Sequence, residues 1–188
     1  MSVANENVSS IHSLPDWEQD NLRSGMRAPY LRQVARGTKI FRAASKTSWK
    51  ADPEAGGWWF NQKAFNKIMA FAVQNDKSCG SLGFAIRRAM AVLVGWNDCD
   101  LLVEGRLKQS VGLFIGRGHK QREITNAGKT VVYKGWTNVD QWYIPGLTEQ
   151  VVKGEEKKYQ QLNSFGRSVI DVYRICPIDS YRPYKTAG

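Results

Sequence analysis

The sequence contains no segment that is typical of a membrane protein. No stretch of the 188 residues approaches the roughly 18 consecutive apolar residues that a membrane-spanning helix needs. The longest apolar run, 89–94, directly follows two arginines. The first residues also lack a basic segment followed by an apolar one, so we expect no secretory signal. The prediction is a protein of the cytoplasm, or one delivered into a target-cell cytoplasm by another route.

Cysteine and histidine are scarce as well. There are three cysteines and two histidines, and no pair of cysteines has the C-x-x-C spacing of a zinc site. An odd number of widely spaced cysteines does not form a disulfide framework, and it favours a reducing compartment. We therefore expect no bound metal.

Acidic residues are outnumbered by basic ones. The chain has 17 Asp and Glu against 27 Lys and Arg, which gives a formal net charge of +10. Such a charge attracts anions and speeds their encounter with the protein. RNA, DNA, a dinucleotide and an acidic protein all fit this property.

The length and the 42% hydrophobic content predict one domain with a sizeable core. We divide the chain into an N-terminal lead-in with a helix (1–36), a catalytic domain (37–176) and a basic C-terminal tail (177–188). Helical spacing of apolar residues within 20–36 predicts the first helix there.

The remaining pattern mixes helices with strands, which predicts an α+β fold. A short strand is expected at 39–43, and a second one at 58–60 leads into a helix capped by Asn61. Another helix is expected after Ser81, with Arg87 and Arg88 toward its exposed flank. Glycine-punctuated, β-rich segments then follow at 101–103, 111–115, 130–133 and 141–144, with a last strand in 168–176.

Two clusters could carry chemistry. In the first, Arg42 precedes Ala43 on an early strand, where its planar guanidinium could bind a phosphate or ribose. The aromatic run at 58–60 could form the wall on which a nicotinamide ring stacks. The alternative is that this aromatic run is a core strand and that Arg42 forms a surface salt bridge.

In the second cluster, Asp140 and Gln141 stand at the beginning of an aromatic strand. A polar side chain held there could bind a ribose hydroxyl and stabilise an oxocarbenium-like state. The alternative is a turn in which Asp140 caps backbone amides. Nearby, Arg117 lies between Gly116 and Gly118, where it could border a phosphate, or else belong to a basic hairpin turn.

In order along the chain, these pieces resemble the ADP-ribosyltransferase superfamily, particularly its bacterial NAD-consuming toxin domains. The resemblance spans about residues 37–147. It implies a split, twisted β core with flanking helices, and NAD as the substrate. It places Arg42 and Ala43 on the first core strand and Gln141, with Asp140, at the late catalytic strand. It also implies that the NAD-binding residues include Trp58, Trp59, Phe60 and Arg117.

The sequence departs from this family at one motif. The common Glu-x-Glu pair is replaced by Val139-Asp140-Gln141. The resemblance therefore favours NAD glycohydrolase activity, or transfer to an acceptor such as nucleic acid, over transfer to a protein arginine. Glu104 and Glu123 are further candidates for the catalytic carboxylate. The toxin resemblance also implies an immunity protein, which charge complementarity predicts to be acidic.

Two other functions fit parts of the sequence. The positive charge and 21 aromatic residues (7 Trp, 7 Tyr and 7 Phe) suit a nucleic-acid-binding or RNA-targeting toxin module. Cys79, His119 and Asn138 follow one another in the order of a cysteine amidase or peptidase.

Overall fold

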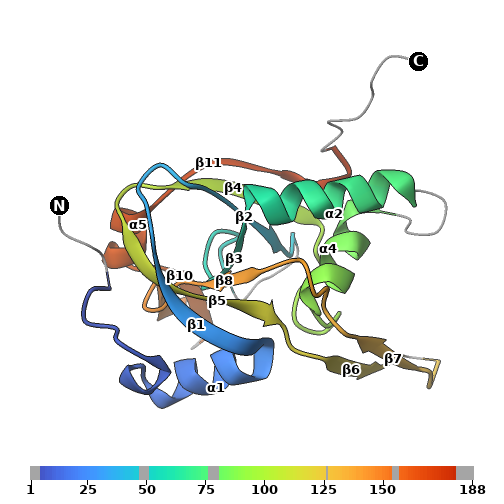
Figure 1. Ribbon diagram of the computed structural model, residues 1–188, viewed down its shortest axis with the longest axis horizontal. Helices are drawn as coiled ribbons and strands as arrows, with labels where there is room; N and C mark the ends of the chain where they lie inside the picture. Colours follow the sequence, from blue (N-terminus) through green and yellow to red (C-terminus); the bar gives the residue numbers. More distant parts are fainter. Residues whose placement is uncertain (1–4, 47–50, 76–80, 126, 154–156, 181–188) are drawn as a thin grey trace.

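The computed structural model describes residues 5–46, 51–75, 81–125, 127–153 and 157–180. Its helices pack against a large antiparallel sheet, so the predicted α+β class is confirmed (Figure 1). Within the described residues, no helix has the length and hydropathy needed to cross a membrane.

The helical elements are the α-helices α1 (Asp16–Gly25), α2 (Gln62–Gln74), α4 (Leu82–Met90) and α5 (Ser164–Val169), with the short 3-10 helices η1 (Ile11–Ser13) and η2 (Ile178–Ser180). The strands are β1 (Met26–Val34), β2 (Lys39–Ala44), β3 (Trp58–Asn61), β4 (Leu101–Leu107), β5 (Val111–Gly118), β6 (Gln121–Ile124), β7 (Thr130–Tyr133), β8 (Gln141–Tyr143), β9 (Thr148–Lys153), β10 (Lys157–Leu162) and β11 (Ile170–Pro177).

Seven strands form one sheet in the order β1-β5-β8-β3-β2-β4-β11. The short strand β3 is where this sheet divides. Its first two residues pair with β8, through Trp58 and Trp59, whereas its last two pair with β2. The strands β1, β5 and β8 therefore form one half-sheet and β2, β4 and β11 the other, with β3 shared between them. Two separate hairpins, β6–β7 and β9–β10, complete the strands.

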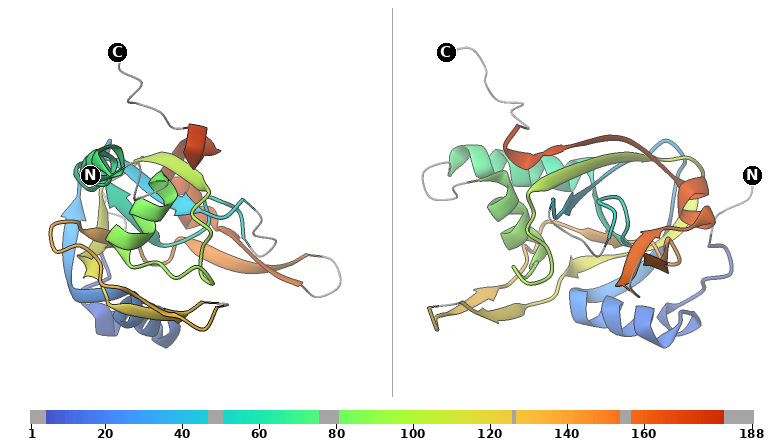
Figure 2. Two further views of the ribbon diagram at one scale, coloured as in Figure 1. Left: turned by 90° about the vertical axis from the view of Figure 1, so that its right-hand side faces the viewer. Right: turned by 180° about the vertical axis from the view of Figure 1, so that it is seen from behind.

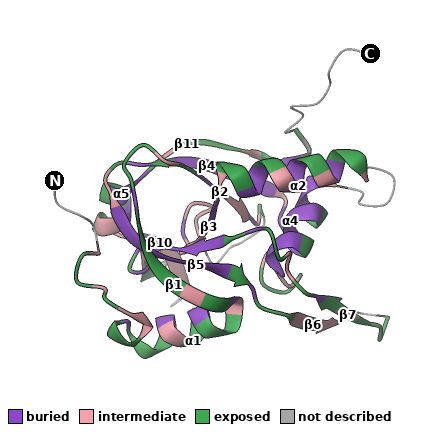
Figure 3. Cartoon of the chain, viewed as in Figure 1, coloured by how far each residue is buried: buried purple, intermediate pink, exposed green. Residues whose placement is uncertain are grey.

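Three apolar clusters hold these layers together. On one face, α2 and α4 cover buried side chains of β2 and β3, among them Phe41 and Phe60. On the other face, Trp59 and Trp142 join strand residues to Leu162 and Val169 near α5. A smaller cluster fixes α1 through Leu22. Figure 3 shows the resulting pattern, in which the central strands are buried while β1 and the β6–β7 hairpin are largely exposed.

The predicted helix caps are confirmed. The Asn61 side chain accepts a hydrogen bond from the Ala64 amide (2.8 Å), and Ser81 accepts one from Phe84 (3.1 Å). Both bonds satisfy an amide that the first turn of a helix leaves without a partner. The strands expected around 39–43, 101–103, 111–115 and 130–133 are also present.

The helix predicted within 20–36 is wrong for most of its length. Helix α1 ends at Gly25, and the chain continues as β1, which pairs with β5. Pro29 cannot donate the amide hydrogen that a helix interior requires, and the pairing with β5 shifts register between Arg27 and Tyr30. The apolar residues that suggested helical spacing are thus divided between two elements.

Arg87 is also placed differently from the prediction. It is buried with 6% exposure instead of lying on the exposed flank of α4, whereas Arg88 is exposed as expected. The Arg87 guanidinium donates to the carbonyls of Asn97 (2.8 Å) and Asp98 (3.0 Å). A buried guanidinium is retained because these carbonyls satisfy it, and it fixes α4 to the loop that precedes β4. Residues 181–188 of the predicted basic tail lie outside the described residues.

Candidate functional site

A cavity of about 420 Å³ opens where the two half-sheets separate. This volume is within the range of roughly 300–1,000 Å³ that is usual for small-molecule sites. Residues from α1, β2, β3, α4, β8 and β10 line it, together with the loops before β3 and β4. Six of the eight residues predicted for the site are among them: Arg42, Ala43, Trp58, Trp59, Phe60 and Gln141.

Arg42 brings a positive charge into this cavity from β2. Its guanidinium donates to the backbone carbonyl of Glu54 (3.3 Å) and lies over the ring of Trp59, 5.7 Å from the ring centroid. Its Nε is inaccessible to solvent and has no hydrogen-bond partner. Burial lowers the pKa of Arg42 to about 10. The predicted surface salt bridge is absent from the described residues, since the one salt bridge among them joins Arg174 to Glu104.

Gln141 faces Arg42 from the other half-sheet, at the first residue of β8. Its side chain is buried, with 6% exposure, and its Nε2 donates to the carbonyl of Met90 at the end of α4. Its Oε1 is buried and has no hydrogen-bond partner. Arg42 and Gln141 thus both line the cavity, and each has one buried polar atom without a hydrogen-bond partner. Such buried polar atoms are costly without a ligand, which makes the pair a candidate binding site.

The three aromatic residues of β3 have different roles. Trp59 and Phe60 are core residues with 1% and 3% exposure, and the Trp59 indole donates to the Gly56 carbonyl (2.9 Å). Trp58 is only half-buried and packs at a tilt on Tyr143, with ring centroids 5.0 Å apart. The core interpretation is therefore confirmed for Trp59 and Phe60, whereas Trp58 keeps exposed surface at the cavity.

The sequence did not single out several residues of the cavity wall. Trp96, which is 57% exposed, joins the wall together with Asn97 and Cys99, all from the loop between α4 and β4. Asn97 fixes this loop to β2, since its amide donates to the Ala43 carbonyl (3.0 Å). Burial raises the pKa of Cys99 to about 11. No local pattern marked this loop, because its position depends on contacts with β2 that are far apart in sequence.

Helix α1 supplies another wall, through Asn21, Ser24 and Gly25. Its buried Glu18 accepts hydrogen bonds from the Tyr143 hydroxyl and from the Gly146 amide, both at 2.9 Å. Burial and the neighbouring Glu18 carboxylate raise the pKa of Tyr143. These two bonds anchor α1 beside β8. The N-terminal region 1–36, predicted as a lead-in with a helix, therefore contributes to the site.

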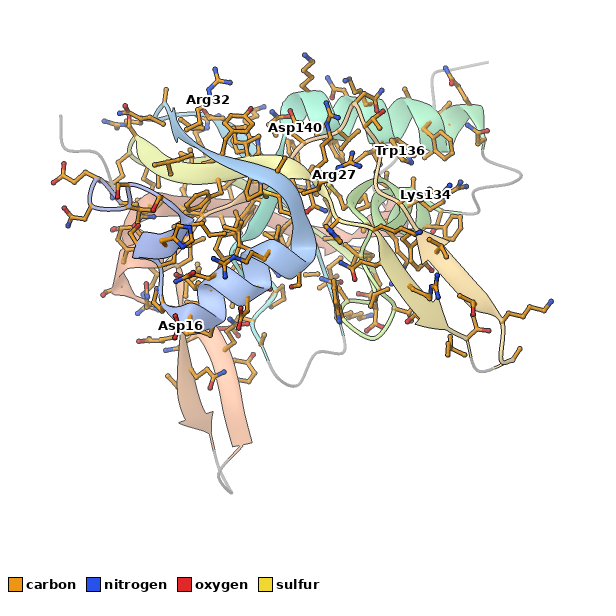
Figure 4. All side chains as sticks on the ribbon, turned by 60° about the horizontal axis from the view of Figure 1, so that its bottom comes forward. Asp16, Arg27, Arg32, Lys134, Trp136 and Asp140 are labelled. Carbon is orange, nitrogen blue, oxygen red and sulfur yellow. The ribbon has the colours of Figure 1, made fainter. Side chains whose placement is uncertain are left out.

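The other predicted site residues do not line the cavity. Arg117 is exposed on β5, where it pairs with Arg27 of β1. Asp140 is exposed in the connection before β8, in the same connection as Trp136 (Figure 4). Of the alternative carboxylates, Glu104 is bound by Arg174 (2.9 Å), and Glu123 accepts from the amides of Val94 and Gly95. Among the described residues, no Asp or Glu lines the cavity.

The cysteine hydrolase alternative receives no geometric support. Cys79 lies outside the described residues. His119 and Asn138 are both exposed, and neither lines the cavity. The described residues also hold no group of three or more His, Cys, Asp or Glu side chains placed to bind a metal ion.

Comparisons with known proteins leave the family of the chain open. No family model matches it, and no curated protein matches it. One similar solved structure is described as "Rhs1-CT in complex with cognate immunity protein RhsI1". It shares 13% sequence identity over 82% of this chain and 84% of that chain, with a TM-score of 0.47. At this level of similarity the match defines neither the fold family nor the function of this protein.

Proposed function

We propose that this protein cleaves the nicotinamide–ribose bond of NAD, as an NAD glycohydrolase or as an ADP-ribosyltransferase, and that it acts as a toxin-like effector. The observation that carries the proposal is that two residues of one cavity wall, Arg42 and Gln141, each have a buried polar atom without a partner, Nε and Oε1 respectively. A dinucleotide with an anionic diphosphate and hydroxyl-bearing riboses suits both of them.

In this proposal, Arg42 binds the diphosphate of NAD. A guanidinium binds phosphate through planar, charge-assisted hydrogen bonds, which are stronger inside a protein than in water. Glu54 attracts the charge of Arg42, but no described carboxylate forms a salt bridge with it, so an anionic ligand would offset the cost of desolvating this charge. The contact with Trp59 holds the guanidinium in place before the ligand arrives.

In this proposal, Gln141 binds the ribose that is attached to nicotinamide. Its Nε2 is held by the Met90 carbonyl, so Oε1 is fixed as the free acceptor for a ribose hydroxyl. As the glycosidic bond breaks, nicotinamide leaves with the bonding electrons and positive charge develops on the ribose. An oriented amide oxygen stabilises that charge. Water or another nucleophile then attacks the same carbon and releases a proton.

Trp58 and Trp96 are the residues for the nicotinamide ring. Both line the cavity and keep exposed surface, unlike Trp59 and Phe60. An offset stack between aromatic rings would hold the nicotinamide while its bond to ribose breaks.

The experiment is nicotinamide release from NAD by the purified protein, with and without cell lysate. Release without lysate indicates a glycohydrolase, and release only with lysate indicates a transferase that needs an acceptor. We expect Arg42→Ala and Gln141→Ala to lower the rate by about 100-fold or more. Arg117→Ala and Asp140→Ala are the matched controls, because both residues are exposed outside the cavity.

Two results would contradict this proposal. One is the absence of nicotinamide release under both conditions. The other is a folded Gln141→Ala variant that turns over NAD at the parental rate. Among the described residues, Gln141 alone of the four candidates for the catalytic carboxylate or its replacement (Gln141, Asp140, Glu104 and Glu123) lines the cavity.

A further inference from the structure

The β6–β7 hairpin carries a concentration of positive charge that the proposed NAD site does not use. Residues 119–134 contain four Lys and Arg and a single carboxylate, Glu123. All four cations are exposed: Lys120, Arg122, Lys129 and Lys134. The hairpin projects from the body of the molecule, as seen from two sides in Figure 2.

The two faces of this hairpin differ. On the inner face, Gln121 donates to the Ser24 carbonyl (2.6 Å), and Glu123 accepts from the backbone amides of Val94 and Gly95. The only carboxylate of the hairpin is therefore already engaged with the body. On the outer face, Arg122 lies opposite Val132, and Ile124 is 71% exposed. The outer face thus presents cations beside exposed aliphatic groups, with no negative charge from the hairpin itself.

The inner-face contacts also place the hairpin at the cavity. Ser24, which accepts from Gln121, lines the cavity, and so does Gly25, whose carbonyl accepts from the His119 amide (2.9 Å). The amides bound by Glu123 belong to the turn directly before Trp96, another cavity residue. The inner face of the hairpin therefore lies beside the cavity wall.

We propose that the β6–β7 hairpin is a binding surface for nucleic acid. A stable protein partner needs about 800 Å² of contact on each side, and a ribbon of two four-residue strands is too narrow to provide that area. A phosphate backbone needs much less contact area, because each cation that meets a phosphate releases a condensed counterion. The exposed aliphatic groups between the cations add contacts with bases or sugars. This surface is independent of NAD chemistry and would exist even without it.

The test is fluorescence anisotropy with a labelled 20-nucleotide single-stranded RNA, without NAD, over a range of salt concentrations. The hairpin variant combines Arg122→Gln, Lys129→Gln and Lys134→Gln. The control combines Arg32→Gln, Lys39→Gln and Lys63→Gln, which removes the same charge from exposed positions on β1, β2 and α2. Figure 4 shows Arg32 and Lys134 well separated on the molecule.

The hairpin variant should bind RNA more weakly than the control by roughly tenfold or more. Its plot of log K against log salt should also have a slope shallower by about 2, because three phosphate contacts are lost and each contributes about 0.7. Equal losses of RNA affinity in both variants would assign the binding to net charge and overturn the proposal. The proposal would also be overturned if polyglutamate displaced the labelled RNA as effectively as unlabelled RNA does. Nicotinamide release, measured in parallel, tests the NAD site separately.

Discussion

At the scale of single residues, Arg42 carries a charge whose desolvation costs stability. Its side chain is half-buried, desolvation lowers its pKa, and its Nε is inaccessible and has no partner. Arg87 differs, because two backbone carbonyls satisfy its buried guanidinium. The sequence indicated Arg42 as a site residue because it is an arginine on an early strand, but it could not show that its Nε would be left without a partner.

We therefore predict that Arg42→Met separates stability from activity. The variant should unfold within about 1 kcal/mol of the parent protein, or be more stable, because an apolar side chain of similar length removes an uncompensated buried charge. Nicotinamide release should fall to background. Thermal unfolding and the NAD assay on the same preparation check both. A variant that lost several kcal/mol of stability but kept its activity would assign Arg42 a structural role.

Cys99 gives a pH-dependent prediction. Burial raises the pKa of this thiol to about 11, so little of it is thiolate at pH 8. Alkylation of native Cys99 should be slow at pH 8 and accelerate by about tenfold per pH unit below the pKa, as followed by mass spectrometry of its peptide. In urea the rate at pH 8 should rise sharply. Equal rates in the native and unfolded protein would contradict burial of this thiol.

The raised pKa of Cys99 also makes the free energy of unfolding depend on pH. The unfolded chain loses the Cys99 proton near pH 8.5 or so, whereas the native protein keeps it until about pH 11. Between these values the native state binds more protons. The contribution of Cys99 to stability is therefore complete below the lower value and is lost as the pH rises through the higher one.

At the scale of elements, the sequence predicted those whose signals are local. The helices after Asn61 and Ser81 have side-chain caps and apolar stripes, and both are present. Strand β1 was missed because it is fixed by pairing with β5, about 80 residues later in the chain. The site, too, could be predicted from the sequence only in part, because it depends on contacts between residues far apart in the chain. Arg42 and Gln141 were chosen from the order of motifs, but the cavity between them arises from the pairing of β3 with two half-sheets.

The contribution of helix α1 to stability and to the cavity, which the sequence did not predict, can be tested by mutation. Tyr143→Phe removes the hydroxyl that donates to the buried Glu18, which then keeps only the Gly146 amide among its described hydrogen bonds. We expect the free energy of unfolding to fall by about 1–3 kcal/mol. The KM for NAD should rise, because α1 lines the cavity. Denaturant titration and NAD kinetics measure the two effects.

The control for α1 is Asp16→Asn, which changes an exposed carboxylate in the first turn of the same helix. It should leave both stability and KM nearly unchanged. If Tyr143→Phe matched this control, the Glu18 contact would not be what anchors α1.

At the scale of the whole molecule, the division of the sheet explains how a ligand could stabilise the protein. The half-sheets meet through β3, and the cavity lies between Arg42 on one and Gln141 on the other. A ligand that contacts both residues binds only the folded arrangement. Binding restricted to the native state raises stability by about 2.7 kcal/mol at a ligand concentration 100 times Kd.

We predict that ADP-ribose, which retains the diphosphate and both riboses, raises the Tm of the parent protein in a concentration-dependent way. Arg42→Met should show little or no shift, because the phosphate contact is lost, whereas Arg117→Ala should behave like the parent. Differential scanning fluorimetry at fixed ionic strength measures all three, since the charge of +10 attracts any anion weakly. Equal shifts in all three proteins would mean that the anion binds elsewhere, and the cavity between the half-sheets would no longer be the NAD site.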